Sequence, residues 1–447
     1  MPEDVLIIGG GLAGLAAGVA LTEAGCRVRL LEQKPYLGGR ARSFREAATG
    51  SVVDNGQHLF MGCYHSTLKF FAAIGTSQTV TFDPQLRVRF LETDKKLTEL
   101  RCPAFPAPWH LLFGVCLSNS FAFGEKVDVV RMGRALRDTR STASAAGALE
   151  HLTVEEWLSE LGQRESLRRN FWDLLCIAAM NEDPQITSAL LFHRVLRLAL
   201  FTSPLDSRLG IPRTGLSDCY TEAAAHTITD HGGSVEPQRD VRALLVSNGE
   251  CHGVKLVDGS TIEAQATLSA VPWHVLPKLL PDETVTTQPF FSRILDLHPA
   301  PIISIYLWFD RAVTDLEFVG LRGTTIQWLF NKGKILGSGE NYISLVLSGA
   351  HDHVARSKED LVDTALRELR TLLPGMSDAR LTHSLVIKER FATFSPCVGV
   401  EALRPSAVTP VRGLYLAGDW TDTSLPATIE GAVQSGYTAA EAILQSN

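Results

Sequence analysis

The strongest constraint on the fold is the first stretch of the chain, where an apolar run leads into a cluster of glycines. Residues 5–8 are apolar, and Gly9, Gly11 and Gly14 follow with the spacing G-x-G-x-x-G before a run of small and apolar residues. This order predicts a strand, a tight turn and a helix, with backbone free to approach a pyrophosphate. The phosphates are expected at the helix N-terminus, where unpaired N–H groups favour negative charge.

A second apolar run, residues 27–31, ends at Glu32. A dinucleotide-binding unit needs a carboxylate about 20 residues after its glycines, where it accepts the hydroxyls of the ribose. A carboxylate also disfavours a 2′-phosphate. The first two strands therefore predict FAD or NAD rather than NADP.

Two further segments favour FAD over NAD. Gly38, Gly39 and Arg40 are followed by the run 54–58, Asp-Asn-Gly-Gln-His. Glycines let backbone approach a flat ring system, and an arginine offers a planar donor fork to pyrophosphate oxygens. These segments resemble the flavin amine oxidase and phytoene desaturase superfamily, in which they lie along the FAD.

The C-terminal segment carries the second strong motif. An apolar run ends at Gly418 and Asp419, and Thr428 opens a glycine-containing helix soon afterwards. Asp419 is placed to hold the ribityl chain, and the helix N-terminus is placed at the pyrimidine edge of the flavin. Glu430 also fits an ordinary acidic residue in the first turn of a helix. The resemblance implies that Val241 touches adenine through its backbone, but Val241 also fits an ordinary valine in a strand. The residues predicted to bind FAD are Gly9, Gly11, Leu12, Ala13, Gly14, Glu32, Gln33, Gly38, Gly39, Arg40, Asn55, Gly56, Gln57, His58, Val241, Ala270, Gly418, Asp419, Thr428, Ile429, Glu430 and Ala432.

Length and composition set wider bounds. A chain of 447 residues is too long for one hydrophobic core, and its net charge of −7 provides no basic stripe for nucleic acid. Eight scattered cysteines without a C-x-x-C motif suit reduced thiols in a cytoplasm and indicate no metal site. The acidic start, residues 1–4, leads directly into the first strand, so we expect no signal peptide.

One stretch comes close to a membrane segment. Residues 102–124 contain no charged residue, but prolines precede their apolar part and Ser118, Asn119 and Ser120 interrupt it, so no span of about 20 apolar residues is available. One interpretation is a core segment of a second domain. The other is a partly exposed apolar surface that dips into the inner face of the cell membrane.

The predicted architecture has two discontinuous parts. An α/β FAD-binding, Rossmann-like domain, with a parallel sheet and a β-hairpin or meander, takes residues 1–60, 205–275 and 412–447. An α+β substrate-binding domain with a helical cap takes residues 61–204 and 276–411. Apolar patterns predict helices over 125–140, from a capping box at Thr153 and Glu156, over 171–200 on both sides of a loop at 181–184, over 218–231 and over 358–372.

At finer grain the chain is similar to the bacterial hydroxysqualene dehydroxylases, formerly squalene-associated FAD-dependent desaturases. The similarity lies in residues 54–58 with Gly62, Cys63 and Tyr64, in residues 417–421 and 425–432, and in Asn181. It implies reductive removal of an allylic hydroxyl from hydroxysqualene, giving squalene for hopanoid synthesis, with reduced FAD as hydride donor. Its partners would be this isoprenoid and an external reductant such as NAD(P)H or a reductase, since no second nucleotide motif is found.

Loss of an allylic hydroxyl as water requires a proton donor. The candidates are His58, beside the expected flavin loop, Tyr64, and Glu182, in the loop between apolar helices. Two of these residues also have a purely structural alternative: His58 would orient the flavin through a hydrogen bond, and Tyr64 would pack in the core.

Three other functions remain open at this point. A carotenoid-type desaturase would use the same fold with oxidised flavin. An amine oxidase is expected to carry an aromatic cage and often a flavin-linked cysteine, yet residues 424–431 contain neither Cys nor Tyr. A prenyl-protein escort of the GDP-dissociation-inhibitor kind would keep the fold without the flavin.

Overall fold

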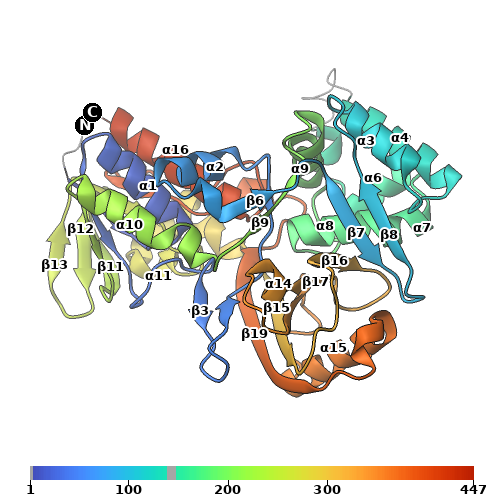
Figure 1. Cartoon of the computed structure of the whole chain (residues 1–447). Coiled ribbons are helices and arrows are strands. Elements are labelled where there is room, and N and C mark those ends of the chain that lie inside the picture. Colours follow the sequence, from blue (N-terminus) through green and yellow to red (C-terminus); the bar gives the residue numbers. More distant parts are fainter. Residues whose placement is uncertain (1–3, 138–146, 447) are drawn as a thin grey trace.

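The computed structural model describes residues 4–137 and 147–446. Figure 1 shows an α/β unit on one side, a large sheet below and a group of helices on the other side. The predicted helix 125–140 is present as α4 (Phe123–Arg137), and its last three residues lie outside the described part, as do residues 1–3.

A five-stranded parallel sheet forms the centre of the first unit. Its strand order is β10-β2-β1-β14-β20, and every neighbouring pair is parallel. Strands β1, β14 and β20 are buried along most of their length, whereas β10 and the start of β2 are partly exposed. The strands are β1 (Asp4–Ile8), β2 (Arg27–Leu31), β10 (Ser234–Glu236), β14 (Ala266–Ser269) and β20 (Leu414–Leu416).

Three helices cover this sheet, and small residues let two of them approach closely. They are α1 (Leu12–Glu23), α10 (Thr221–Asp230) and α16 (Ile429–Gln445). A Cβ added at Gly436 would lie 2.3 Å from the carbonyl oxygen of Ala13, so α16 packs directly on the backbone of α1. The predicted meander is present as β11 (Val241–Ser247), β12 (Glu250–Leu256) and β13 (Thr261–Glu263), all antiparallel.

The segments after β2 join the first unit to the large sheet. They form a hairpin of β3 (Ser43–Arg45) and β4 (Val52–Asp54), then a small sheet of β5 (Phe60–Met61), β9 (Leu209–Pro212) and β6 (Val80–Phe82), with α2 (His65–Ala73) between β5 and β6. Phe60 and Phe70 share one hydrophobic cluster with α1 and α16. The boundary expected at residue 60 therefore falls inside a strand that packs with the first unit.

The large sheet has seven strands in the order β19-β15-β18-β17-β16-β7-β8. Its strands are β7 (Arg87–Leu91), β8 (Leu97–Arg101), β15 (Pro299–Phe309), β16 (Phe318–Leu321), β17 (Trp328–Asn331), β18 (Tyr342–Leu347) and β19 (Leu381–Phe394). Helix α15 (Lys358–Leu372), with the predicted bounds, packs its apolar side on one face. The short helix α14 (Lys332–Ile335) packs on β17 and β18, whereas α11 (Leu276–Leu279), α12 (Asp282–Thr287) and α13 (Pro289–Ser292) lie on the side of the meander β11–β13.

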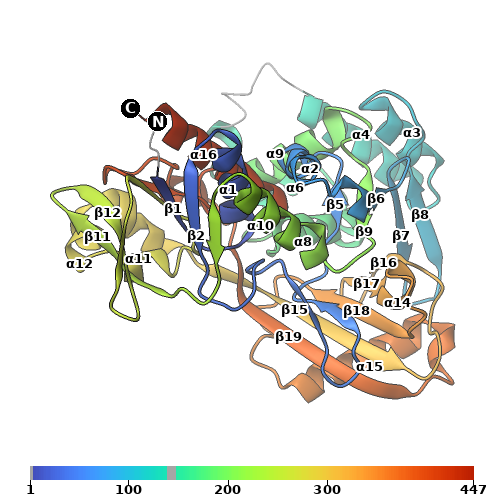
Figure 2. The same ribbon diagram turned by 60° about the vertical axis from the view of Figure 1, so that its left-hand side comes forward.

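The remaining helices form what we call the helical cap. They are α3 (Trp109–Leu117), α4, α6 (Val154–Glu160), α7 (Glu165–Leu167), α8 (Asp173–Met180) and α9 (Ala189–Phe201), with a π-helical turn at Arg168–Trp172. Thr153 and Glu156 make the predicted capping box of α6. Figure 2 shows the cap standing over β7, β8 and β16. Within the described residues no helix is both long and apolar enough to cross a bilayer.

Candidate functional site

The glycine turn after β1 has the geometry of a phosphate site. Gly9 has φ +107°, and its N–H donates to the carbonyl of Leu31 at 2.8 Å. A Cβ at Gly14 would lie 2.0 Å from the Gly9 oxygen, whereas a Cβ at Gly11 would meet no protein atom within 4 Å. Helix α1 starts without a side-chain cap and without an acid in its first turn. Its first N–H groups, and the space above Gly11, therefore suit a pyrophosphate.

The carboxylate of Glu32 lies directly beside this turn. One oxygen accepts from the N–H of Gly10 at 2.7 Å, and the other accepts from the N–H of Lys34 at 2.8 Å. These bonds fix the orientation of the Glu32 carboxylate beside the turn, and its role as ribose acceptor stays a prediction. Gln33, next in the chain, donates through Nε2 to Asp240 at 3.1 Å on the surface.

The segment around Arg40 joins the two ends of the chain. Gly38 donates to the carbonyl of Gly10 at 2.8 Å, and Gly39 lies against Gly11. The Arg40 guanidinium donates to the carboxylate of Asp419 at 2.6 Å and to the carbonyl of Ala392 at 2.7 Å. The expectation that the first glycine turn and the last aspartate lie together is therefore met.

The loop 55–58 follows β4 and is anchored on both sides. Asn55 donates through Nδ2 to the carbonyl of Arg40 at 3.2 Å and to Glu389 at 3.3 Å. The Nδ1 atom of His58 lies 2.7 Å from the carbonyl of Gly56, so Nδ1 carries the proton. The buried Oε1 atom of Gln57 has no partner among the described residues, which suits a loop that faces a polar ligand.

Two further predicted residues, Ala270 after β14 and Val241 at the start of β11, lie at different places relative to the glycine turn. Ala270 donates to the carbonyl of Ile8 at 2.9 Å, and its own carbonyl would lie 3.0 Å from a Cβ at Gly9. Val241 is buried at the start of β11, opposite Leu256. Ala270 is thus part of the turn, while Val241 lies on the meander.

The C-terminal motif forms a second helix start facing the same region. Gly418 has φ +139° and donates to Ser435 at 2.8 Å. Thr428 caps α16 by accepting from the N–H of Gly431 at 3.0 Å, and the N–H of Ala432 donates to its carbonyl. Ile429 is buried as the first residue of that helix.

Glu430 has a partner that the sequence did not reveal. Its carboxylate accepts from the N–H groups of Ser66 at 2.8 Å and Thr67 at 2.9 Å, and from the Thr67 hydroxyl at 2.7 Å. It therefore caps helix α2, which has no cap of its own. A contact of Glu430 with FAD stays a prediction, and its carboxylate is already bonded to α2.

The three candidate proton donors occupy different environments. Burial lowers the pKa of His58, partly offset by the nearby Asp54 carboxylate. Burial also raises the pKa of Tyr64, which packs edge-on against Phe60 beside α2. Glu182 is buried in the loop between α8 and α9 and lies 3.0 Å from Nε2 of His351.

The sequence did not reveal a buried ion pair between Lys332 and Asp54, which lies just before the loop 55–58. Lys332 at the start of α14 is fully buried and donates to Asp54 at 2.6 Å. The other Asp54 oxygen accepts from Ser43 at 2.7 Å and from the N–H of Leu216 at 3.0 Å. The local sequence does not mark Lys332 as buried, because Lys334, two residues away, is exposed. No group of three His, Cys, Asp or Glu in the described residues could hold a metal ion.

The comparisons with known proteins agree with this geometry. Residues 12–444 match the family model described as flavin containing amine oxidoreductase. The chain is 30% identical to the hydroxysqualene dehydroxylase of Rhodopseudomonas palustris, over 99% of both chains, and 28% identical to that of Zymomonas mobilis, over 98% of both. It is 28% identical to a 15-cis-phytoene desaturase of an Oncidium hybrid, over 99% of this chain and 78% of the relative.

Solved structures share the fold. An oxidoreductase from Methanosarcina mazei superposes with a TM-score of 0.75 at 16% identity, over 99% of this chain and all of the other. A putrescine oxidase superposes with a TM-score of 0.73 at 16% identity over the full length of both chains. With a family match over nearly the whole sequence and a dinucleotide cradle built from both ends, the chain belongs to the flavin containing amine oxidoreductase family and is an FAD-dependent oxidoreductase.

Proposed function

We propose that the enzyme reductively removes the hydroxyl of hydroxysqualene to form squalene. The observation that carries this proposal is the end-to-end similarity to hydroxysqualene dehydroxylases, which covers 99% of both chains in one case. The allylic C–O bond breaks, the hydroxyl leaves as water with one added proton, and a hydride arrives at the carbon. Reduced FAD supplies that hydride, and an external donor such as NAD(P)H or a reductase restores the reduced state.

The chain's own residues must supply the proton. His58 bonds Gly56 through Nδ1, so a proton for the substrate would leave from Nε2 of the imidazolium. Tyr64 keeps its proton because burial raises the pKa of its phenol. The Glu182 carboxylate lies 3.0 Å from Nε2 of His351, so its side chain is held by that ring. We place His58 first because it follows the loop that carries the unpaired Gln57 oxygen.

The cap provides an apolar environment for a long hydrocarbon. Half-buried apolar side chains of α8 and α9, among them Leu175, Ala179 and Val195, pack against a hydrophobic cluster that extends from the cap into the first unit. Side chains of this kind would exclude water from a developing allylic cation and hold an isoprenoid through apolar contact. These properties favour a hydrophobic isoprenoid substrate.

The deciding experiment is an anaerobic incubation of the photoreduced holoenzyme with hydroxysqualene, followed by extraction and mass spectrometry. We expect squalene, formed in proportion to flavin oxidised. If hydroxysqualene stays intact while phytoene or an amine reacts with the oxidised enzyme, the proposal is wrong.

Phytoene-type desaturation is the second candidate. It is favoured by the 28% identity to the Oncidium desaturase. The two reactions start from opposite states of the flavin, because desaturation removes hydride from the substrate. Incubating the oxidised enzyme with phytoene without a reductant therefore separates them.

We also propose that the enzyme contacts a lipid bilayer through an apolar face on α3 and α4. The face consists of Phe105, Trp109, Phe113, Leu117, Phe123 and Val127, all exposed. Leu117 is 72% exposed and Phe123 is 85% exposed, although both are large apolar side chains. Figure 1 shows α3 and α4 at the outer edge of the cap.

Charge around this face fits an anionic membrane surface. Arg131, Arg134 and Arg137 are exposed along α4, and Lys126 lies beside the end of α3, where it donates to the Cys116 carbonyl. Aromatic side chains bordered by cations are typical of helices that lie in the membrane interface. A bilayer is also where a squalene-like substrate would be dissolved.

A further inference from the structure

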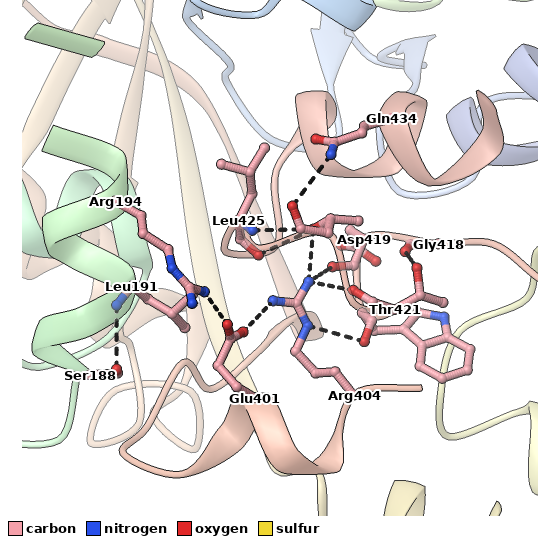
Figure 3. Close-up of polar contacts among 12 residues, drawn as sticks. Ser188, Leu191, Arg194, Glu401, Arg404, Gly418, Asp419, Thr421, Leu425 and Gln434 are labelled. Carbon is pink, nitrogen blue, oxygen red and sulfur yellow. Dashed lines mark hydrogen bonds and ion pairs between the residues drawn. The ribbon is translucent and has the colours of Figure 1, made fainter. Parts of the chain in front are cut away.

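A buried arginine holds the loop that carries Asp419. The side chain of Arg404 has no exposed surface. Its guanidinium carbon lies 4.8 Å from the centre of the Phe394 ring. It donates to the carbonyls of Asp419 at 3.3 Å, Trp420 at 3.4 Å and Thr421, and to the hydroxyl of Thr423 at 2.8 Å. One side chain thus fixes the backbone of residues 419–423 (Figure 3).

The same arginine is connected to the helical cap. Glu401, in the short 3-10 turn Val400–Leu403, accepts from Arg404 at 2.9 Å through one oxygen. Its other oxygen accepts from Arg194, which projects from α9 (Figure 3). We call Arg194, Glu401 and Arg404 the cap bridge, because they connect a cap helix to the flavin loop through side chains alone.

The end of β19 lies directly beneath this bridge. Three consecutive residues contact three different parts of the chain: the carbonyl of Ala392 accepts from Arg40, the hydroxyl of Thr393 accepts from Asn181, and the ring of Phe394 lies under Arg404. The N-terminal flavin segment, the cap loop and the C-terminal flavin loop therefore meet at one place.

We infer that the cap bridge is a set of positioning residues through which helix α9 holds the flavin loop 418–425. The single negative charge of Glu401 is shared by two guanidinium groups, with one oxygen bonded to Arg404 and the other to Arg194, so removing Arg194 frees one side of the carboxylate and weakens the constraint on Glu401 and then on Arg404. Because α9 also belongs to the apolar cap, a ligand that moves α9 would change the setting of the flavin loop.

Hydrogen exchange of the full-length, FAD-loaded protein tests this inference. In Arg194→Met we expect amides of residues 418–425 to exchange at least about threefold faster than in wild type, although residue 194 does not belong to that segment. Arg197→Met is the matched control: it removes the same charge from the same helix, and within the described residues Arg197 has no ion pair. We expect no change at 418–425 in that control.

A second pair of measurements separates positioning from general destabilisation. Arg194→Lys retains a cation for the single bond to Glu401 and is expected to restore wild-type exchange. Helix α15, on the far face of the large sheet, should exchange at the same rate in all variants. Unchanged exchange at 418–425 in Arg194→Met, or an equal increase at α15, overturns the inference. The test uses FAD alone, so its outcome does not depend on hydroxysqualene being the substrate.

Discussion

Arg40 and Asp419, 379 residues apart in the sequence, form a hydrogen-bonded ion pair at 2.6 Å, with the Asp419 side chain only 9% exposed. The pair connects the first FAD segment to the last. Since the second Arg40 amino group bonds Ala392 in the large sheet, one guanidinium holds three parts of the cofactor site together.

Arg40→Lys should weaken FAD binding at least about tenfold, or about 1.4 kcal/mol. A lysine carries a point charge and cannot form the planar fork that reaches both Asp419 and Ala392. Flavin fluorescence quenching gives the dissociation constant. Arg45→Lys, in the exposed hairpin, is the control, because among the described residues the Arg45 side chain bonds only the carbonyl of Gly50. Equal affinities in the two variants would contradict the role of the fork.

Gly11→Val should remove the yellow flavin from the purified protein while leaving the fold intact. A Cβ at Gly11 meets no protein atom within 4 Å, so the new side chain would clash with the bound cofactor and not with the protein. Replacing this N-cap residue should lower the free energy of unfolding by about 1 kcal/mol. The ratio of absorbance at 450 nm to that at 280 nm gives the FAD content. Gly133→Val in α4, where only Phe201 approaches to 4.0 Å, should stay yellow. A yellow Gly11→Val protein would show that no phosphate lies over this turn.

Lys332→Met should destabilise the protein by about 3–5 kcal/mol, because it leaves the buried Asp54 carboxylate without its partner. The double variant Asp54→Asn with Lys332→Met should regain part of that loss. Urea unfolding followed by tryptophan fluorescence measures both. Arg169→Met removes an exposed pair with Glu165 and should cost about 1 kcal/mol or less. A similar small cost for Lys332→Met would mean that Asp54 reaches water.

If His58 is the proton donor, activity should fall as pH rises through a pKa below the ordinary histidine value of 6.5, because burial lowers the pKa of His58. The imidazolium is the active form, and its fraction decreases above that pKa. Initial rates of squalene formation between about pH 5 and 8 measure this fall in activity with rising pH. In His58→Gln the reaction should be slower, and its rate should no longer depend on pH in this range. If the same fall in rate persists in His58→Gln, a group other than His58 donates the proton.

Replacing Leu117 and Phe123 together by Ser should lower binding to phosphatidylglycerol vesicles at least about tenfold, because each apolar side chain contributes up to about 1.5–3 kcal/mol when buried. Vesicle sedimentation measures the bound fraction. Leu295→Ser, which changes a side chain that is 60% exposed outside the cap, is the control. If both proteins bind equally, the apolar face on α3 and α4 does not contact the bilayer.

Local patterns predicted the elements well because their causes are local. The capping box at Thr153 and the bounds of α15 follow from a few neighbouring side chains, and the glycine turn follows from backbone sterics at Gly9 and Gly14. The resemblance to flavin oxidoreductases then placed both ends of the chain at one cofactor, and the ion pair between Arg40 and Asp419 confirms that they meet.

The parts that could not be predicted depend on partners far away in the sequence. Glu430 fits an ordinary acid of a first helical turn, yet it caps a helix that starts more than 360 residues earlier. Lys332 is one of many lysines until Asp54 is known to face it, and Arg404 shows no periodicity that would mark it as buried. In each case the determining fact is a buried charged group whose partners lie in another part of the fold.

The close packing of Gly436 on Ala13 has a consequence for biosynthesis. The first helix is translated long before α16, which covers it, and Arg40 is translated 379 residues before the aspartate with which it pairs. A nascent chain therefore leaves this side of α1 uncovered until α16 has been made, and the cofactor site is not complete before then.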